Sequence, residues 1–142
     1  MHLLKLLIRN KKWFIYIPLT VHWISIFILT SLPDKDLPSV NFDDKIKHFI
    51  AYFVLSFFLS LALNVQNKFK RMKESYIKFA LLITLIYSTF DEIHQVFIPG
   101  RSAEFWDWLA NMFGILLGVF LVKSLVERDK SKQLSKNGTE IG

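Results

Sequence analysis

The chain contains no cysteine among its 142 residues. Disulfide bonds and thiol chemistry are therefore excluded, and cysteine usage leaves the redox compartment open. The chain also lacks a phosphate-cradling glycine loop, a Ser/His/Asp nucleophile arrangement and a metal-binding spacing such as His-Glu-x-x-His. We therefore predict no metal site and no cofactor. No small-x-small cleavage site ends the first apolar run, so a cleaved signal peptide is not expected.

Hydrophobic residues make up 52% of the chain, and aromatic residues make up 15%. They are gathered into four blocks of about 20 residues, the length of helix that crosses a ~30 Å hydrocarbon core. The blocks are Trp13–Leu32, Ile46–Val65, Phe79–Ile98 and Phe105–Val122. A soluble four-helix bundle would instead place polar residues at every third or fourth position. The sequence therefore predicts an all-α, four-span transmembrane helical bundle.

The basic residues that produce the net charge of +6 are distributed unevenly along the chain. Of the 18 Lys and Arg residues, 14 lie before the first block, between the second and third blocks, or after the fourth block. They are Lys5, Arg9, Lys11, Lys12, Lys68, Lys70, Arg71, Lys73, Lys78, Lys123, Arg128, Lys130, Lys132 and Lys136. Because cytoplasmic loops carry an excess of Lys and Arg, this distribution predicts that both termini lie in the cytoplasm. We interpret the charge as a topology signal and predict no nucleic-acid partner.

On this topology the chain divides into a basic cytoplasmic N-terminus (1–12), a transmembrane domain (13–122) and a cytoplasmic tail (123–142). The tail is polar and lacks aromatic residues from Glu127 onward, so it is predicted to be disordered. The basic connection over 64–78 is predicted to form a short helical turn on the membrane surface.

Polar residues interrupt the second apolar block near its outer end. At 100° per residue, Lys45, His48, Tyr52 and Ser56 fall on one face of a helix, and Asp44 lies beside them. This face is predicted to turn away from lipid.

The third and fourth blocks carry matching polar stripes. In the third block, Asp91 and Gln95 are one helical turn apart, and Glu92 adjoins Asp91. In the fourth block, Asp107 and Asn111 share a face. Three helices are thus expected to present polar groups in the same half of the membrane.

Two adjacent carboxylates in an apolar helix are costly. A charged side chain at the bilayer centre costs about 2.5–3.5 kcal/mol on insertion scales. Asp91 and Glu92 are therefore expected to face the bundle interior, where Arg101, Lys45 and His48 are the available cations. The sequence predicts one outward-facing polar pocket. Its predicted ligand-binding residues are Asp44, Lys45, His48, Tyr52, Asp91, Glu92, Gln95, Arg101, Asp107 and Asn111.

Other interpretations of these residues stay open. A buried carboxylate–arginine network could simply hold the helices together, since interhelical polar contacts contribute about 0.6 kcal/mol each. Glu92, Asp107 and His48 are the candidates for acid–base catalysis, which requires that paired carboxylates differ in pKa. Gly114 and Gly118, spaced as G-xxx-G, are predicted to form a helix-packing seam.

Three segments resemble the signature blocks of the VanZ-like membrane proteins. They are DKIKHFIAYFVL (44–55), DEIHQVFIPGR (91–101) and DWLANMFGILLG (107–118). The matching residues are Asp44, Lys45, His48, Tyr52 and Leu55; Glu92, Gln95, Phe97, Pro99 and Arg101; and Asp107, Asn111, Gly114 and Gly118. Ser31 and Pro33 also resemble the family, whereas Ser56 stands where a glycine is common. The resemblance covers roughly residues 13–122.

The resemblance implies a small integral membrane protein of the bacterial cell envelope. The named member of the family is associated with low-level resistance to teicoplanin, a glycopeptide that carries a lipid tail.

We therefore expect a multi-pass protein of the bacterial cytoplasmic membrane that binds or remodels an amphiphile at the outer leaflet. The expected partner is a membrane lipid, a lipid-linked phosphate or a lipoglycopeptide, whose anionic head group Arg101 and Lys45 would contact. A membrane-embedded hydrolase or transferase and a structural or assembly protein are the alternatives. Whether the chain is an enzyme, and its oligomeric state, are left open.

Overall fold

The computed structural model describes residues 8–33, 35 and 43–139, which contain helices and no strand. The elements are η1 (Lys12–Tyr16, one π-helical turn), α2 (Ile17–Ser31), α3 (Asp44–Val65), α4 (Lys70–Glu74), α5 (Tyr76–Gln95) and α6 (Phe105–Thr139). The predicted all-α class is confirmed, and so is the short basic helix between the second and third blocks, which is α4. Most of the predicted basic N-terminus (1–12) lies outside the described residues.

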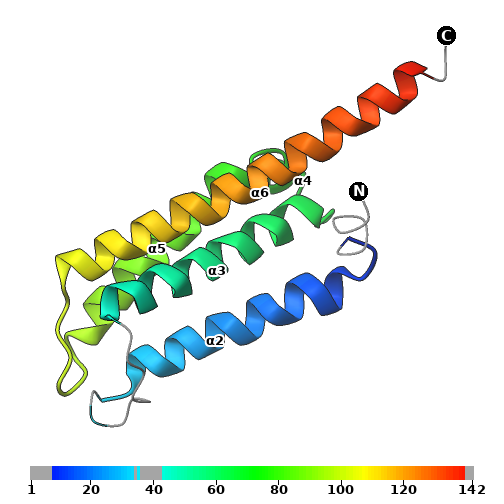
Figure 1. Ribbon diagram of the computed structural model, residues 1–142. Coiled ribbons are helices and arrows are strands. Elements are labelled where there is room, and N and C mark those ends of the chain that lie inside the picture. Colours follow the sequence, from blue (N-terminus) through cyan, green and yellow to red (C-terminus); the bar gives the residue numbers. More distant parts are fainter. Residues whose placement is uncertain (1–7, 34, 36–42, 140–142) are drawn as a thin grey trace.

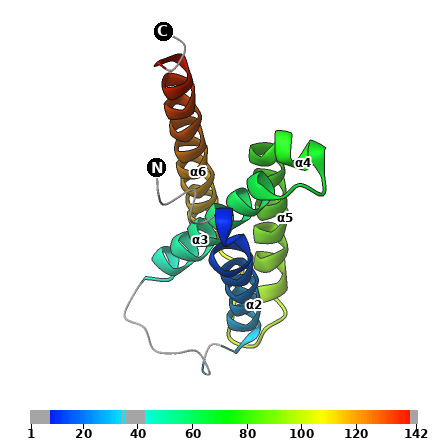
Figure 2. The ribbon, with the colours of Figure 1, turned by 90° about the vertical axis from the view of Figure 1, so that its right-hand side faces the viewer.

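The helices run side by side between two ends of a bundle (Figure 1). The start of η1, helix α4 and the last part of α6 lie at one end, which we call the terminal end. The end of α2, the start of α3 and the turn after α5 lie at the other end, which we call the loop end. Helix α3 is central, because it contacts α2, α5 and α6, and its contact with α6 is the most extensive in the bundle. Figure 2 shows α2 and α5 on neighbouring sides of α3.

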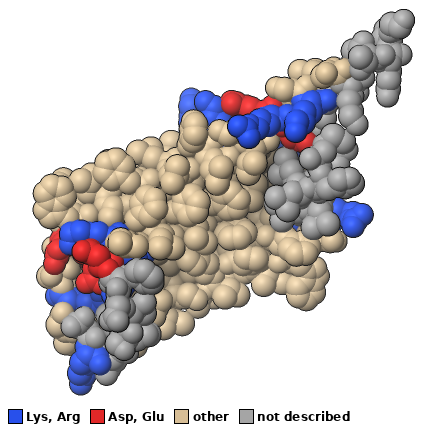
Figure 3. All heavy atoms as spheres, viewed as in Figure 1, with Lys and Arg blue, Asp and Glu red and all other residues tan. Residues whose placement is uncertain are grey.

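In the part of the chain that the structure describes, three helices are long and apolar enough to cross a membrane. They are Lys12–Ser31, Asp44–Val65 and Phe105–Lys132. Figure 3 shows that, on the face in view, Lys, Arg, Asp and Glu gather at the two ends and leave an uncharged band between them. Large apolar side chains are exposed in this middle part, including Phe27 on α2 and Phe113 and Phe120 on α6. An apolar band of this extent is expected to face lipid rather than water.

Helix α5, the remaining predicted span, contains too many charged residues to be identified as membrane-spanning from its composition alone. Its 20 residues include Lys78, Asp91 and Glu92, so every 18-residue stretch of it holds all three charges. The two carboxylates are nevertheless buried. An apolar stripe occupies the opposite side of the helix and is exposed. The stripe consists of Leu82, Ile86, Phe90 and Ile93.

The structure contradicts the predicted disorder of the tail from Glu127. Helix α6 continues through Thr139. Lys123 and Glu127 form an i,i+4 ion pair of 3.9 Å, and Val126 is buried in the core. No glycine or proline interrupts the helix between Gly118 and Gly138, so nothing in this part of the chain breaks the backbone hydrogen bonding.

Helices α3 and α6 approach closely at two glycines. A Cβ atom on Gly114 would overlap the Phe49 carbonyl oxygen, and one on Gly118 would overlap Ser56 Oγ. The missing side chains therefore allow the two backbones to come together, as in other small-xxx-small helix pairs.

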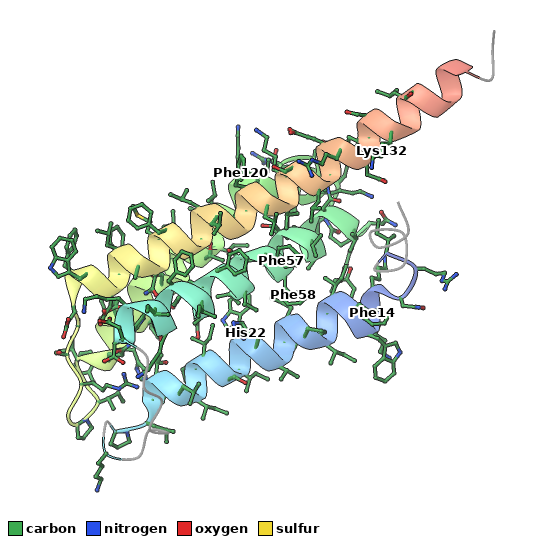
Figure 4. The ribbon with its side chains drawn as sticks, viewed as in Figure 1. Phe14, His22, Phe57, Phe58, Phe120 and Lys132 are labelled. Carbon is green, nitrogen blue, oxygen red and sulfur yellow. The ribbon has the colours of Figure 1, made fainter. Side chains whose placement is uncertain are left out.

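Helix α2 is attached to the bundle less extensively. His22 points from α2 toward α3 (Figure 4), and its Nε2 donates a hydrogen bond of 2.9 Å to the Ala51 carbonyl oxygen. Near the loop end, Ser31 Oγ lies 3.1 Å from His94 Nε2 on α5. These contacts join α2 to both α3 and α5.

We expect Gly114→Ala to destabilise the bundle by about 1–3 kcal/mol, because the added methyl group meets backbone atoms of α3 that cannot rotate away. Thermal unfolding of the purified protein in detergent, followed by circular dichroism, measures the effect. Leu117→Ala is the matched control, since Leu117 lies on the exposed side of the same helix. Equal melting temperatures of the two variants would contradict the close approach of α3 and α6.

Candidate functional site

A cavity of about 260 Å³ lies at the loop end of the bundle. Helices α2, α3 and α5 and the turn after α5 form its walls. The polar lining residues are Asp44, Lys47, His48, Tyr52, Asp91 and Arg101, together with Thr30. The apolar ones are Ile26, Leu29 and Ala51. We call this space the loop-end cavity.

The start of α3 positions several of the polar lining residues. Asp43 caps the helix, because its side chain accepts a 2.9 Å hydrogen bond from the Lys45 backbone N–H. Asp44 then lies in the first turn, where its carboxylate pairs with Lys47 Nζ at 2.9 Å. Both side chains of this pair are substantially exposed, so the pair lies at the edge of the cavity.

Asp91 is the deepest charged residue of the cavity. It is 2% exposed, and its Oδ2 accepts a 2.9 Å hydrogen bond from the Tyr52 hydroxyl. Asp91 forms no ion pair with any residue that the structure describes. Its side-chain partners are therefore neutral hydroxyl groups, Tyr52 on α3 and Thr30 on α2.

Arg101 does not pair with the buried carboxylates, contrary to the expectation from the sequence. Its Nη2 donates a 3.0 Å hydrogen bond to the Leu29 carbonyl oxygen. That carbonyl lies in the last turn of α2, where backbone oxygens have no partner within the helix. The buried Nε of Arg101 has no hydrogen-bond partner among the described residues.

A second group of polar residues lies next to the cavity and joins three helices. Asn111 on α6 donates from Nδ2 to Glu92 Oε1 on α5 at 3.1 Å. Its Oδ1 lies 3.1 Å from His48 Nδ1 on α3. Because an amide oxygen only accepts, His48 Nδ1 is the donor in this bond. We call this group, Glu92, Asn111 and His48, the interhelical network.

Asp107 and Lys45 extend the interhelical network toward the start of α6. His48 lies between two carboxylates, with Nδ1 3.7 Å from Glu92 Oε1 and Nε2 3.9 Å from Asp107 Oδ2. Lys45 Nζ lies 3.6 Å from Asp107 Oδ1 and 3.7 Å from Glu104 Oε2. Lys45 was expected to offset the charge of Asp91 and Glu92, but it pairs with Asp107 on α6 and with Glu104 just before that helix.

The residues predicted for one pocket therefore fall into two neighbouring sets. Asp44, Tyr52, Asp91 and Arg101 line the loop-end cavity, while Lys45, Glu92, Asp107 and Asn111 lie in or beside the interhelical network. His48 belongs to both sets.

Gln95 belongs to neither set. It is buried, and its Nε2 has no hydrogen-bond partner among the described residues.

Sequence reasoning did not single out Lys47 or Leu29. The i,i+3 spacing of Lys47 from Asp44 is a signal that could have identified the lysine. The backbone carbonyl of Leu29 leaves no such signal, because any residue could supply it.

Within the described part of the chain, no three His, Asp or Glu side chains are grouped so that they could hold a metal ion. The cavity residues can recognise charge, and the residues of the interhelical network hydrogen-bond across helices.

We expect Asn111→Ala to destabilise the protein by about 1–3 kcal/mol, because Glu92 Oε1 and His48 Nδ1 each lose a buried partner. Thermal unfolding in detergent measures this cost. Thr20→Ala serves as the control, since the Thr20 hydroxyl is exposed and bonds only within its own helix. A variant that melts like the control would show that the interhelical network does not hold α3, α5 and α6 together.

Comparison with known proteins identifies the family of the chain. The family model described as VanZ/LLP1 matches residues 4–126, so the chain belongs to this family. The match extends over η1 and α2 to α5 and over most of α6. No curated protein and no solved structure matches the chain.

Proposed function

We propose that this member of the VanZ/LLP1 family is a four-span protein of the bacterial cytoplasmic membrane with both termini in the cytoplasm. In the proposal, the loop-end cavity faces the outer leaflet and binds the head group of a membrane lipid, a lipid-linked phosphate or a lipoglycopeptide. The family and the three apolar helices support a VanZ-like membrane protein.

The burial of α5 supports a fourth span. Helix α5 lies beside α3 and α6 between the same two ends of the bundle. Its charges at Asp91 and Glu92 are covered by these neighbours, and its apolar stripe is exposed, as a lipid-facing surface requires. If α5 spans the membrane, the chain crosses four times and its two termini share one side.

The distribution of charge supports the proposed orientation. Basic α4 and the basic part of α6 after Val122 lie at the terminal end. The positive-inside rule assigns that end to the cytoplasm. The loop end, with the cavity, would then face outward.

Because the chain has no cysteine, single cysteines can report the topology without background labelling. We expect Ser102→Cys, in the loop-end turn, to react with a membrane-impermeant maleimide in intact cells. Ser131→Cys, on the exposed surface of α6, should react only after the membrane is permeabilised. Labelling of Ser131→Cys in intact cells, with protection of Ser102→Cys, would contradict the proposed topology.

The loop-end cavity is the observation that carries the binding proposal. It combines charged side chains with the apolar walls Ile26, Leu29 and Ala51. Leu29 is also 43% exposed on the outside of the bundle, so the cavity lies next to the lipid-facing surface. An amphiphile needs this combination, because its head group and its chains require different surroundings.

The volume of the cavity limits which part of a ligand enters it. Pockets for drug-sized molecules measure roughly 300–1,000 Å³. A cavity of about 260 Å³ therefore suits a head group, while the acyl chains, or the bulk of a lipoglycopeptide, would remain outside. A resistance-type envelope function would follow if the bound group belonged to an antibiotic or to its target.

In this proposal Arg101 contacts the anionic part of the head group, since a guanidinium binds phosphate or carboxylate through several parallel N–H donors. Glu92 and Asn111 are positioning residues, because their hydrogen bonds hold the helices that form the cavity walls. His48 links the two sets of residues.

Native mass spectrometry of the protein extracted in mild detergent tests the proposal. We expect wild-type protein to retain an amphiphile, and Arg101→Ala to lose at least about tenfold in occupancy, because a charge-assisted contact disappears. Lys70→Ala is the control, since Lys70 is an exposed cation at the terminal end. Equal occupancy in all three proteins would contradict the proposed contact.

The same experiment distinguishes the two other functions. One observation favours a hydrolase or transferase, namely the position of His48 between Glu92 and Asp107. A divalent ion that is present in wild type and lost in Asp107→Asn would support it. An empty cavity in every variant, with Arg101→Ala less stable than wild type, would support a structural protein.

A further inference from the structure

Four Asp, Lys and Arg side chains line the loop-end cavity, and two of them pair with each other. Asp44 and Lys47 form an ion pair of 2.9 Å at its edge. Asp91 and Arg101 remain. Each lines the same cavity, and neither forms an ion pair with a described residue.

Asp91 presents a negative group without a positive partner. It is 2% exposed, and its side-chain hydrogen-bond partners, Tyr52 and Thr30, are neutral hydroxyl groups. A buried carboxylate is costly unless a cation or several donors approach it. The carboxylate therefore favours a ligand that brings positive charge and N–H donors.

Arg101 carries a positive group that has no negatively charged partner within ion-pair distance among the described residues. A guanidinium has five N–H donors. Among the described residues, the one hydrogen bond of this side chain is that of Nη2 with the Leu29 carbonyl oxygen. The buried Nε has no partner among the residues that the structure describes. The guanidinium therefore favours a ligand that brings acceptor oxygens and negative charge.

One ligand can satisfy both residues if it carries both charges close together. We propose that the loop-end cavity recognises a zwitterionic head group with a phosphodiester at Arg101 and a primary ammonium at Asp91, the chemistry of an aminophospholipid. This inference rests on the proposed head-group function and narrows it to one class of ligand. A purely anionic head group would leave Asp91 unpaired and would place a second negative charge beside it.

The inference also requires that the ammonium group of the ligand carries N–H donors for Asp91. A carboxylate accepts hydrogen bonds from a primary ammonium, whereas a quaternary ammonium has no N–H to donate. The apolar walls and the exposed edge of Leu29 place the chains of a lipid outside the cavity, against the apolar surface of α2.

A methylation series on the wild-type protein tests the inference without any mutation. Native mass spectrometry would measure binding of phosphatidylethanolamine, its N-monomethyl and N,N-dimethyl derivatives, phosphatidylcholine and phosphatidylglycerol, all with the same acyl chains. We expect affinity to fall with each methyl group and by about tenfold or more over the series, as the N–H donors to Asp91 disappear. Phosphatidylglycerol should bind more weakly than phosphatidylethanolamine.

Three variants test which residue binds each of the two charged groups of the head group. Asp91→Asn should remove the dependence on methylation, and Arg101→Gln should weaken binding of every lipid in the series. Lys70→Gln, at the opposite end of the bundle, should change neither. If Asp91→Asn fails to fold, the series on wild-type protein still decides the question.

Water-soluble glycerophosphoethanolamine distinguishes a lipid from a free phosphodiester. Failure to compete with phosphatidylethanolamine would support a lipid ligand, and equal competition would support the same head-group chemistry from a soluble source. Equal or tighter binding of phosphatidylcholine or phosphatidylglycerol would overturn the inference while leaving the proposed head-group function intact. Absence of binding by every lipid would also overturn the inference, whereas the proposed function fails only if the extracted wild-type protein retains no amphiphile of any kind.

Discussion

Lipid cannot solvate the adjacent carboxylates of Asp91 and Glu92, and this constraint determines how α5 sits in the bundle. Neighbouring residues on a helix point about 100° apart, so the two side chains reach different helices. Asp91 meets Tyr52 on α3, and Glu92 meets Asn111 on α6. The two hydrogen bonds together fix the rotation of α5, and that rotation leaves its apolar side exposed.

The glycines of α6 make the second of these bonds possible. Gly114 and Gly118 let α6 approach the backbone of α3, and Asn111 lies one turn before Gly114 on the same face. The amide can therefore bond to Glu92 on one side and to His48 on the other. Polar residues and small residues thus serve one purpose here, because the polar bonds require the close approach that the glycines permit.

The two sets of polar residues differ in how well they are paired. In the interhelical network, Asn111 uses both its donor and its acceptor within the protein. At the loop-end cavity, Asp91 and Arg101 have no ion pair with a described residue. A buried charge without a partner is unfavourable unless binding compensates for it. This difference is why we assign helix positioning to the network and ligand recognition to the cavity.

The sequence by itself determined the helical class, the approximate helix boundaries, the polar faces and the family. Block length and the spacing of polar residues carry the information on helices and faces, because they depend only on the geometry of each helix, while three sequence motifs carry the family. The sequence does not give the distances between helices. The bond from Arg101 to the Leu29 carbonyl and the pairing of Lys45 with Asp107 were therefore found only in the tertiary structure. The polar composition of the region after Glu127 predicted disorder, but helix α6 continues there through Thr139. No glycine or proline lies between Gly118 and Gly138 to interrupt it. The rotation and close approach of α3, α5 and α6 decided which of the predicted polar residues face the cavity. The position of a side chain around its own helix does not determine which residue of a neighbouring helix lies opposite it.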